Sequence, residues 1–317
     1  MNRQLINISI VVPVYGCDES LDELHSRLVN VLANLVDSYE IILVDDCGQG
    51  KAWSKIQNLS KHDKSVIGIR LSRNFGQHYA ITAGLDYAKG DWCIVMDCDL
   101  QDQPEEIIKL YNKAQEGYHV VVGKRANRKD NFFVKMTSKL FYTLFNYLSG
   151  QKLDNRVANY GIYSRKVIDN VKKYKEKDRA FGLLVTLVGF SRAEIEIEHA
   201  HRISGKSSYN FRKRMSLAMD SILSHSNKPL LLAVKTGFIC SIIAVIYAVW
   251  LIIRFFIWSH VPDGWTSLMV SLFFLSGLIV SVTGMVGVYI GKIYNEVKER
   301  PLYIVDQTTL NEFENDD

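Results

Sequence analysis

WCIVMDCDLQDQPEE, residues 92–106, passes from an apolar run to a polar turn within a few positions. The apolar run 93–96 predicts a buried strand, and Pro104 predicts the start of a helix. Asp97 and Asp99 stand between them, and on extended chain two such side chains point the same way. Paired carboxylates repel one another unless a hard cation, which prefers oxygen ligands, lies between them. The stretch predicts either an acidic metal site at a strand end or simply a strand followed by an acidic helix cap.

Apolar runs rich in Val and Ile recur through about the first 125 residues, at 8–12, 41–44, 66–71, 93–96 and 120–122. Apolar residues at helical spacing fill the gaps between them. Continuous apolar strands separated by amphipathic helices are typical of a parallel sheet with helices on both faces. We therefore expect an α/β fold, and a later strand at 193–198, where polar and apolar residues alternate.

Polar residues follow three of these runs directly. They are Tyr15, Asp18 and Glu19 after the first run, Asp45 and Asp46 after the second, and Asp97 and Asp99 after the fourth. In a parallel sheet, ligands bind beyond the carboxyl ends of the strands, so this convergence predicts a site there. The sequence G-x-G-x-x-G is absent, which argues against a dinucleotide-binding unit.

Composition narrows the class of protein. The net charge of +4 over 317 residues is too small to argue for a nucleic-acid partner. The five cysteines form no C-x-x-C pair and no zinc spacing, so we expect reduced thiols, as in the cytosol, instead of a disulfide framework. The N-terminus lacks the long apolar core of a signal peptide.

Two charge-free runs, 236–253 and 264–291, dominate the C-terminal third. Each is long enough to cross a hydrocarbon core of ~30 Å as a helix. Lysines and arginines lie outside the two runs and none lies in the turn 258–265, which by the positive-inside rule places both ends in the cytoplasm. We expect a transmembrane hairpin of about 230–257 and 266–291; two buried helices of a soluble core are the alternative.

These patterns divide the chain into three parts. Residues 1–227 form a cytoplasmic domain, 228–292 the two membrane helices, and 293–317 a cytoplasmic tail. Within the first part, 132–149 and 207–227 combine apolar and aromatic residues with Lys and Arg edges. Such helices can lie flat in the head-group layer of a bilayer, or they can pack on the sheet.

The order of motifs is familiar: VVPVYG, ILVDDCG, LSRNFGQHYAITAGLDYAKGD, DCDLQDQPE, VVGKR, SRKVID and RISGKSSYNF, followed by two spans. From about residue 8 to residue 298, this order resembles the family 2 glycosyltransferases that load a sugar onto a polyprenyl phosphate. They include dolichol-phosphate mannose synthases and bacterial undecaprenyl-phosphate glycosyltransferases. The resemblance implies a GT-A-like fold, Rossmann-like and mostly parallel, with interfacial helices and a C-terminal transmembrane hairpin.

The resemblance also implies an activity. It is the inverting, metal-dependent transfer of a sugar from a nucleotide-diphosphate sugar to undecaprenyl or another polyprenyl phosphate, with Mg²⁺ or Mn²⁺. A UDP-sugar is favoured and a GDP-sugar is the alternative donor. The reaction would take place at the cytoplasmic face of the inner (plasma) membrane and serve cell-envelope glycan or lipid modification. The sequence leaves open whether the chain forms a homo-oligomer.

The resemblance assigns the donor side residue by residue. It implies nucleotide binding by Pro13, Tyr15, Glu19, Asp46, Arg73, Gln77 and Asp97. It implies a metal and diphosphate site at Asp97, Asp99 and Gln101. Gly76 would let the backbone approach the ligand and would open a helix. A plain turn at Pro13 and Tyr15, and a plain helix start at Gly76, are the structural alternatives.

The acceptor side follows the fifth apolar run. The resemblance implies that the lipid phosphate is held by Arg125, Arg128, Lys135 and Ser138, and guanidinium groups suit phosphate geometry. A mobile loop near the diphosphate would contribute Arg202, Lys206, Ser207 and Tyr209. A solvated or lipid-facing basic edge is the alternative for any single one of the acceptor-side residues.

One position departs from the family pattern. Many relatives carry an Asp where this chain has Asn159, and an amide cannot act as a general base at neutral pH; Asp154 is the candidate substitute. The implied catalytic set is therefore Asp97, Asp99, Arg125, Arg128 and Asn159. The competing hypotheses are a glycosyltransferase with a hydroxyl acceptor, which would need a base, and a non-catalytic membrane-anchored subunit that binds a nucleotide sugar.

Overall fold

The computed structural model describes residues 6–48, 50–125, 157–198, 226, 228–258 and 264–310. The chain divides into two compact units. We call the first the sheet unit; it comprises Met1–Lys129, Asp154–Ser207 and Arg300–Asp317. We call the second the helical unit; it comprises Asp130–Leu153 and Ser208–Glu299. The two units are described separately.

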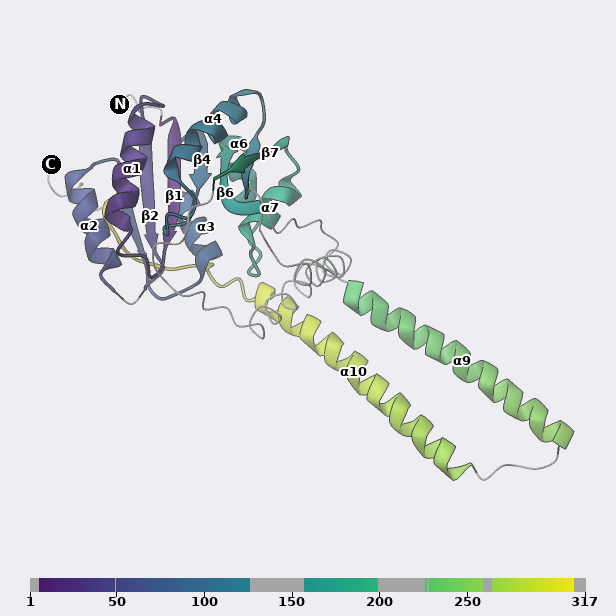
Figure 1. Ribbon diagram of the computed structural model, residues 1–317. Coiled ribbons are helices and arrows are strands. Elements are labelled where there is room, and N and C mark those ends of the chain that lie inside the picture. Colours follow the sequence, from purple (N-terminus) through teal and green to yellow (C-terminus); the bar gives the residue numbers. More distant parts are fainter. Residues whose placement is uncertain are drawn as a thin grey trace. The chain divides into compact units, whose positions relative to one another are not determined.

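The sheet unit is built on an eight-stranded sheet in the order β7–β5–β6–β4–β1–β2–β3–β8 (Figure 1). The strands are β1 (Ile8–Val14), β2 (Tyr39–Asp45), β3 (Val66–Leu71), β4 (Trp92–Val95), β5 (Val120–Arg125), β6 (Val157–Ser164), β7 (Arg192–Ile197) and β8 (Val305–Thr308). The runs expected from the sequence correspond to β1 to β5, and the alternating segment corresponds to β7.

Helices cover both faces of this sheet, as predicted. They are α1 (Leu21–Ala33), α2 (Ala52–His62), α3 (Gln77–Tyr87), the 3₁₀ turn η1 (Pro104–Glu106), α4 (Ile107–Gln115), α6 (Arg165–Val171) and α7 (Phe181–Val188). Apolar residues of α1, α2 and α4 share one core with Ile10 and Val12 of β1. Residues of α3, α6 and α7 share the other core with Val11. Successive residues of β1 thus enter opposite cores, because side chains alternate along a strand.

The central strands β4, β1, β2 and β3 run parallel to one another, so their carboxyl ends share one edge of the sheet. β6 is antiparallel and lies between β4 and β5. Gly161 allows this close pairing, because a Cβ there would lie 2.8 Å from Tyr163 Oη and 2.9 Å from the carbonyl oxygen of Val121. The sheet is therefore mixed, with a parallel centre that positions the site described below.

The segment 293–317, which we expected to be a cytoplasmic tail, contains strand β8 after α10. It pairs antiparallel with β3 at the edge of the sheet. The Trp53 indole Nε1 donates to Gln307 Oε1 at 2.7 Å, and Tyr303 Oη donates to Asp86 Oδ2 at 2.7 Å. Thr309 is buried. A segment that follows the helical unit in sequence thus completes the sheet unit.

The helical unit contains two long helices, α9 (Lys228–Trp258) and α10 (Trp265–Val297). The spans expected from the sequence fall within them. By length and composition both can cross a membrane, and their most apolar windows are 0% buried inside the structure. Large apolar side chains are exposed along both, including Phe238 (68%) and Phe273 (72%). Such exposure suits helices that face lipid and differs from the buried core helices of the alternative interpretation.

Candidate active site

The candidate site lies at the carboxyl edge of the parallel strands, where the loops after β1, β2, β3 and β4 meet. Main-chain and side-chain hydrogen bonds connect these loops directly. The backbone N–H of Asp46, after β2, donates to the carbonyl of Val14 at the end of β1 at 3.0 Å. This is the edge at which ligands bind in open parallel sheets.

Asp46 fixes the loop that begins helix α3. Its side chain is buried, and its two carboxylate oxygens accept the backbone N–H groups of Phe75 (2.7 Å) and Gly76 (2.8 Å). Burial raises the pKa of Asp46, and the two backbone hydrogen bonds act in the opposite direction. Gly76 has φ +106°, a conformation that favours glycine, immediately before α3. The expected contact of Asp46 with a base or ribose stays a prediction; the observed contacts are with the protein backbone.

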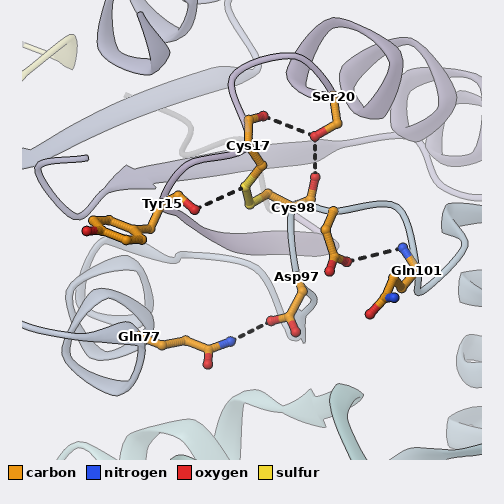
Figure 2. Close-up of a disulfide and its surroundings, with 8 residues drawn as sticks. Tyr15, Cys17, Ser20, Gln77, Asp97, Cys98 and Gln101 are labelled. Atoms are coloured by element: carbon orange, nitrogen blue, oxygen red, sulfur yellow. Dashed lines mark hydrogen bonds between the residues drawn. A yellow bond between two sulfur atoms is a disulfide. The ribbon is translucent and has the colours of Figure 1, made fainter. Parts of the chain in front are cut away.

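Gln77, the first residue of α3, reaches across to the acidic pair. Its side-chain Nε2 donates to Asp97 Oδ1 at 2.6 Å (Figure 2). Gln77 is exposed and Asp97 is half-buried, so both side chains remain accessible from solvent. The resemblance assigned Gln77 to nucleotide binding, and the structure brings it to the carboxylate expected to bind the metal.

Asp97 and Asp99 do not continue the strand, which corrects the expectation that both lie on extended chain. β4 ends at Val95, and a turn follows at Cys98 and Asp99. Asp99 Oδ1 accepts the backbone N–H of Gln101 at 3.2 Å, and Leu100 has φ +58°. Aspartate side chains form such local turns by bonding the backbone two residues on, and here this bond competes with extended structure.

A disulfide joins Cys17, in the loop after β1, to Cys98, between the two aspartates (Figure 2). The expectation of unpaired thiols is therefore wrong for these two residues. The partners are 81 residues apart in sequence, so no spacing motif could have revealed the pair. Among the described residues, Cys47, Cys93 and Cys240 are free.

Ser20 makes a second connection between the same two loops. Its hydroxyl lies 2.7 Å from the carbonyl oxygen of Cys98 and 3.0 Å from that of Cys17, and its one hydrogen serves both. A serine directly before a helix usually caps the helix, but Ser20 makes no side-chain cap to α1. Sequence reasoning missed this role because the same residue type predicts an ordinary cap.

Four of the residues expected to bind the nucleotide lie in two different environments. Pro13 is buried inside strand β1, opposite Val44, and so is not part of the loop in which we expected it. Tyr15 is 60% exposed just beyond the strand, and Glu19 is also exposed. Arg73 is exposed, with its guanidinium carbon 4.0 Å from the centre of the Phe75 ring. Tyr15, Glu19 and Arg73 are exposed beyond the strand ends, whereas Pro13 is buried within β1.

The acceptor-side residues fall mostly outside the described ranges. These are Arg128, Lys135, Ser138, Arg202, Lys206, Ser207 and Tyr209, with Asp154 and the segments 132–149 and 207–227. Arg125 and Asn159 are described by backbone alone, at the end of β5 and in β6. Asn159 lies two residues before Gly161, which pairs with Val95 at the last residue of β4.

The donor set at Asp97, Asp99 and Gln101 consists of carboxylate and amide oxygens, which suit Mg²⁺ or Mn²⁺. Within the part of the chain that the structure describes, no group of three or more His, Cys, Asp or Glu side chains could hold a metal ion. Mg²⁺ is commonly bound by one or two carboxylates together with substrate phosphates and water. The residues present therefore fit a cation that is shared with a diphosphate.

Two further contacts hold the segment after the acidic pair. The Tyr160 hydroxyl, buried in β6, donates to the carbonyl of Gln103 at 2.9 Å. Arg27 of α1 donates from Nε to Glu105 Oε1 at 2.9 Å. Sequence reasoning missed both roles, because neither residue belongs to a motif. They anchor the chain directly after the candidate metal ligands.

A family model and several curated proteins match this chain, and all of them describe glycosyltransferases. The model of the family "Glycosyl transferase family 2" matches residues 9–172. An uncharacterised glycosyltransferase of Bacillus subtilis is 38% identical over 96% of this chain and 94% of its own length. Undecaprenyl-phosphate 4-deoxy-4-formamido-L-arabinose transferase of Proteus mirabilis is 35% identical (96% and 94%). The prophage-derived bactoprenol glucosyl transferase of Shigella flexneri is 34% identical (96% and 98%).

A solved structure shares the fold. It is glucosyl-3-phosphoglycerate synthase from Mycobacterium tuberculosis in complex with Mn²⁺, UDP and phosphoglyceric acid. The TM-score is 0.50 at 15% identity, over 69% of this chain and 77% of that one. At this identity the likeness concerns the fold alone.

Proposed function

Since this chain belongs to glycosyl transferase family 2 and is a glycosyltransferase, we propose that it transfers a sugar from a nucleotide-diphosphate sugar to a polyprenyl phosphate. The relatives named for undecaprenyl phosphate and bactoprenol support this acceptor, because they align over nearly their whole length. The solved structure with this fold contains UDP, so a uridine diphosphate sugar is the first donor to test.

The observation that carries the proposal is the joining of four strand-end loops around the acidic pair. Gln77 contacts Asp97, Ser20 contacts the carbonyl of Cys98, and Asp46 holds the start of α3. A site for a nucleotide diphosphate needs oxygen ligands for a cation beside accessible side chains for the base. Asp97 and Asp99 supply the ligands, and the exposed residues Tyr15 and Arg73 follow β1 and β3 of the same parallel sheet.

A divalent cation, when bound, would neutralise charge on the leaving diphosphate. Asp97, Asp99 and Gln101 would hold it and orient the diphosphate. The acceptor phosphate has its second pKa near ~6, so it is mostly a dianion at pH 7 and needs no proton removed. Attack from the face opposite the leaving group would invert the anomeric centre. The protein must therefore bring two anions together and hold them in line.

The position of Asn159 favours a phosphate acceptor over a hydroxyl acceptor. Attack by a sugar or lipid hydroxyl requires a general base within hydrogen-bonding reach. This chain has Asn159 where many relatives carry an Asp, and the Asn159 amide cannot supply that base. A lipid phosphate tolerates this change because it is already ionised.

The helical unit fits the same proposal. We propose that α9 and α10 cross the bilayer with the catalytic edge at its cytoplasmic face. Lys228 and Lys235 begin α9, and Lys292 and Lys298 lie near the end of α10, which supports a cytoplasmic location for both ends. The long isoprenoid tail of the acceptor would then reach the site from the membrane.

Replacing Asp99 with alanine tests the site. We expect Asp99→Ala to lower turnover by at least ~100-fold, the scale of removing one key electrostatic contact. The assay measures transfer of labelled sugar from UDP-sugars to undecaprenyl phosphate by the full-length protein, with Mg²⁺ or Mn²⁺ and with a chelator. Transfer that is unchanged in Asp99→Ala would refute the assignment.

Asp91 offers a matched control. It stands at the amino end of the same strand, with an exposed side chain. Asp91→Asn should transfer sugar like the native protein, because Asp91 lies at the amino end of β4, away from the carboxyl ends of the parallel strands. Equal losses in Asp99→Ala and Asp91→Asn would indicate a general effect of removing charge instead of a metal site.

A further inference from the structure

The Cys17–Cys98 disulfide lies within the donor site itself. Cys98 separates the two aspartates, and Cys17 is two residues from exposed Tyr15 (Figure 2). The bond therefore links the loop expected to bind the base with the loop expected to bind the metal. A change at this bond acts directly on both parts of the donor site.

The two loops are held together by more than the disulfide. The Ser20 hydroxyl bonds to the carbonyl oxygens of both cysteines, at 3.0 Å for Cys17 and 2.7 Å for Cys98. The two Cα atoms are 6.2 Å apart, inside the usual range of about 4.4–6.8 Å for disulfides. The Ser20 contacts do not involve sulfur, so reduction of the disulfide leaves their donor and both acceptors chemically unchanged.

The arrangement differs from a disulfide framework that stabilises a secreted protein. Cys93 is fully buried and free, and Cys47 and Cys240 are also free. On the cytoplasmic side of a membrane, where the proposed function places this domain, disulfides are rare and usually serve catalysis or redox sensing. This cytoplasmic location rests on the proposed function.

We propose that Cys17 and Cys98 form a reversible redox switch that lowers donor binding when it is oxidised. In the disulfide form, Asp97 accepts a hydrogen bond from Gln77, and Asp99 accepts one from the backbone of Gln101. A cation bound by Asp97 and Asp99 would compete with these hydrogen bonds for the carboxylate oxygens, so the two side chains must be able to adjust when the donor binds. The disulfide restrains the residue between them, so the reduced form is the form that binds the donor well.

The oxidant that converts the Cys17 and Cys98 thiols to the disulfide is a low-molecular-weight disulfide, such as oxidised glutathione. Cys17 is partly exposed and Cys98 is nearly buried, so Cys17 attacks first and forms a mixed disulfide, releasing one small thiol. Cys98 then attacks the Cys17 sulfur and releases the second small thiol. Two electrons pass from the cysteines to the oxidant, and their two protons end on the released thiols. Excess reduced thiol reverses both steps.

The test uses the full-length protein in detergent or vesicles, equilibrated in glutathione buffers from reducing to oxidising. Mass spectrometry reports the Cys17–Cys98 bond, calorimetry reports binding of UDP with Mn²⁺, and the transfer assay reports KM and kcat. We expect oxidation to weaken UDP–Mn²⁺ binding by at least about 5-fold, the lower end of typical coupling between sites. Reductant should restore binding.

Variants separate the switch from general oxidation. Cys17→Ser should bind the donor with the same affinity at every glutathione ratio, whereas Cys98→Ser should accumulate a mixed disulfide at Cys17. Cys47→Ser, a half-buried thiol in the loop after β2, should respond like the native protein. Equal UDP–Mn²⁺ affinity in the oxidised and reduced native protein, with the bond confirmed, would overturn the switch.

The two proposals fail in different ways. If the reduced protein binds UDP with Mn²⁺ but transfers no sugar to undecaprenyl phosphate, the acceptor assignment fails while the binding comparison still tests the switch. If transfer occurs and is independent of the disulfide, the switch fails and the proposed function stands.

Discussion

The residues at the candidate site are engaged with one another. Asp46 accepts two backbone N–H groups, and Gln77 donates to Asp97. Residue types and strand ends were enough to predict that Asp46 and Asp97 share one edge of the sheet, whereas Gln77 was assigned by the family resemblance. Their partners were not predictable, since each contact joins loops distant in sequence. Ser20 and Cys98 show why these contacts could not be predicted. The sequence predicts a helix cap for the serine and a buried thiol for the cysteine.

His78, next to Gln77, gives a prediction about pH. The backbone N–H of Phe181 donates to His78 Nδ1, with 3.4 Å between the two nitrogen atoms. Burial, and secondarily the Arg179 guanidinium, lower the pKa of His78 below its ordinary 6.5. The folded protein therefore favours the neutral ring, and this contribution is fully present above pH 6.5 and is lost as the pH falls below it. We expect the urea midpoint to fall between pH 7.5 and pH 5.5.

His78→Gln should reduce this pH dependence, because glutamine keeps an acceptor and does not titrate. His62→Gln is the control: His62 contacts the carbonyl of Asn58 on the exposed surface of α2 and should leave the pH dependence in place. An equally steep loss of stability in native protein and His78→Gln would show that other groups cause it.

At the scale of elements, apolar runs predicted the parallel strands and the helices between them. They failed at β6 and β8. β6 contains Asn159, Tyr160 and Gly161, a mixed run without the continuous apolar pattern of the parallel strands. β8 is VDQT, a polar sequence that suits an edge strand and resembles a solvated tail. In both cases the pairing partner decides the structure, and a local pattern does not report the partner.

Thr309, directly after β8, tests how firmly this edge is held. Its Oγ1 accepts the backbone N–H of Gly68 in β3 at 3.0 Å, and Thr309 N donates to the Gly68 carbonyl at 3.0 Å. Thr309→Val keeps the shape but leaves the buried N–H of Gly68 unpaired, which should cost about 1–3 kcal/mol. Thr309→Ser keeps the hydroxyl and should cost less.

The free energy of unfolding from denaturant titration provides the measurement for both Thr309 variants. If valine proves as stable as serine, the hydrogen bond to Gly68 does not hold the edge. The packing of the threonine methyl group would then be the larger contribution.

At the scale of the whole molecule, the order of motifs and the two apolar runs were sufficient to indicate the family and the number of long C-terminal helices. It was not predictable that the C-terminal segment belongs to the sheet unit. Arg300–Asp317 belongs with the sheet unit, although it follows the helical unit in sequence. A cut after residue 227, at the expected domain boundary, would therefore remove a strand of the sheet as well as the helices.

Replacing residues 228–299 with a flexible Gly/Ser linker, and keeping 300–310, isolates the role of the helices. We expect this variant to bind UDP with Mn²⁺ like the full chain and to use short isoprenyl phosphates. It should use long-chain polyprenyl phosphate poorly, because the tail would no longer be delivered from the bilayer. Rates with short and long acceptors provide the comparison. Equal use of both would mean that α9 and α10 do not serve the acceptor.

The truncation after residue 227 is the companion control. It should melt at a lower temperature than the linker variant, since β3 loses its edge partner. Equal melting temperatures would show that β8 contributes little to the sheet.

The position of β8 has a consequence for biosynthesis. A ribosome makes the chain from its N-terminus, so β3 emerges long before its neighbour at the edge. That neighbour is translated only after both long apolar helices. Until then β3 presents unpaired backbone groups, the feature that promotes association between nascent chains. The sheet is thus completed only after α9 and α10 have been synthesised. A chain whose synthesis stops within these helices lacks strand β8.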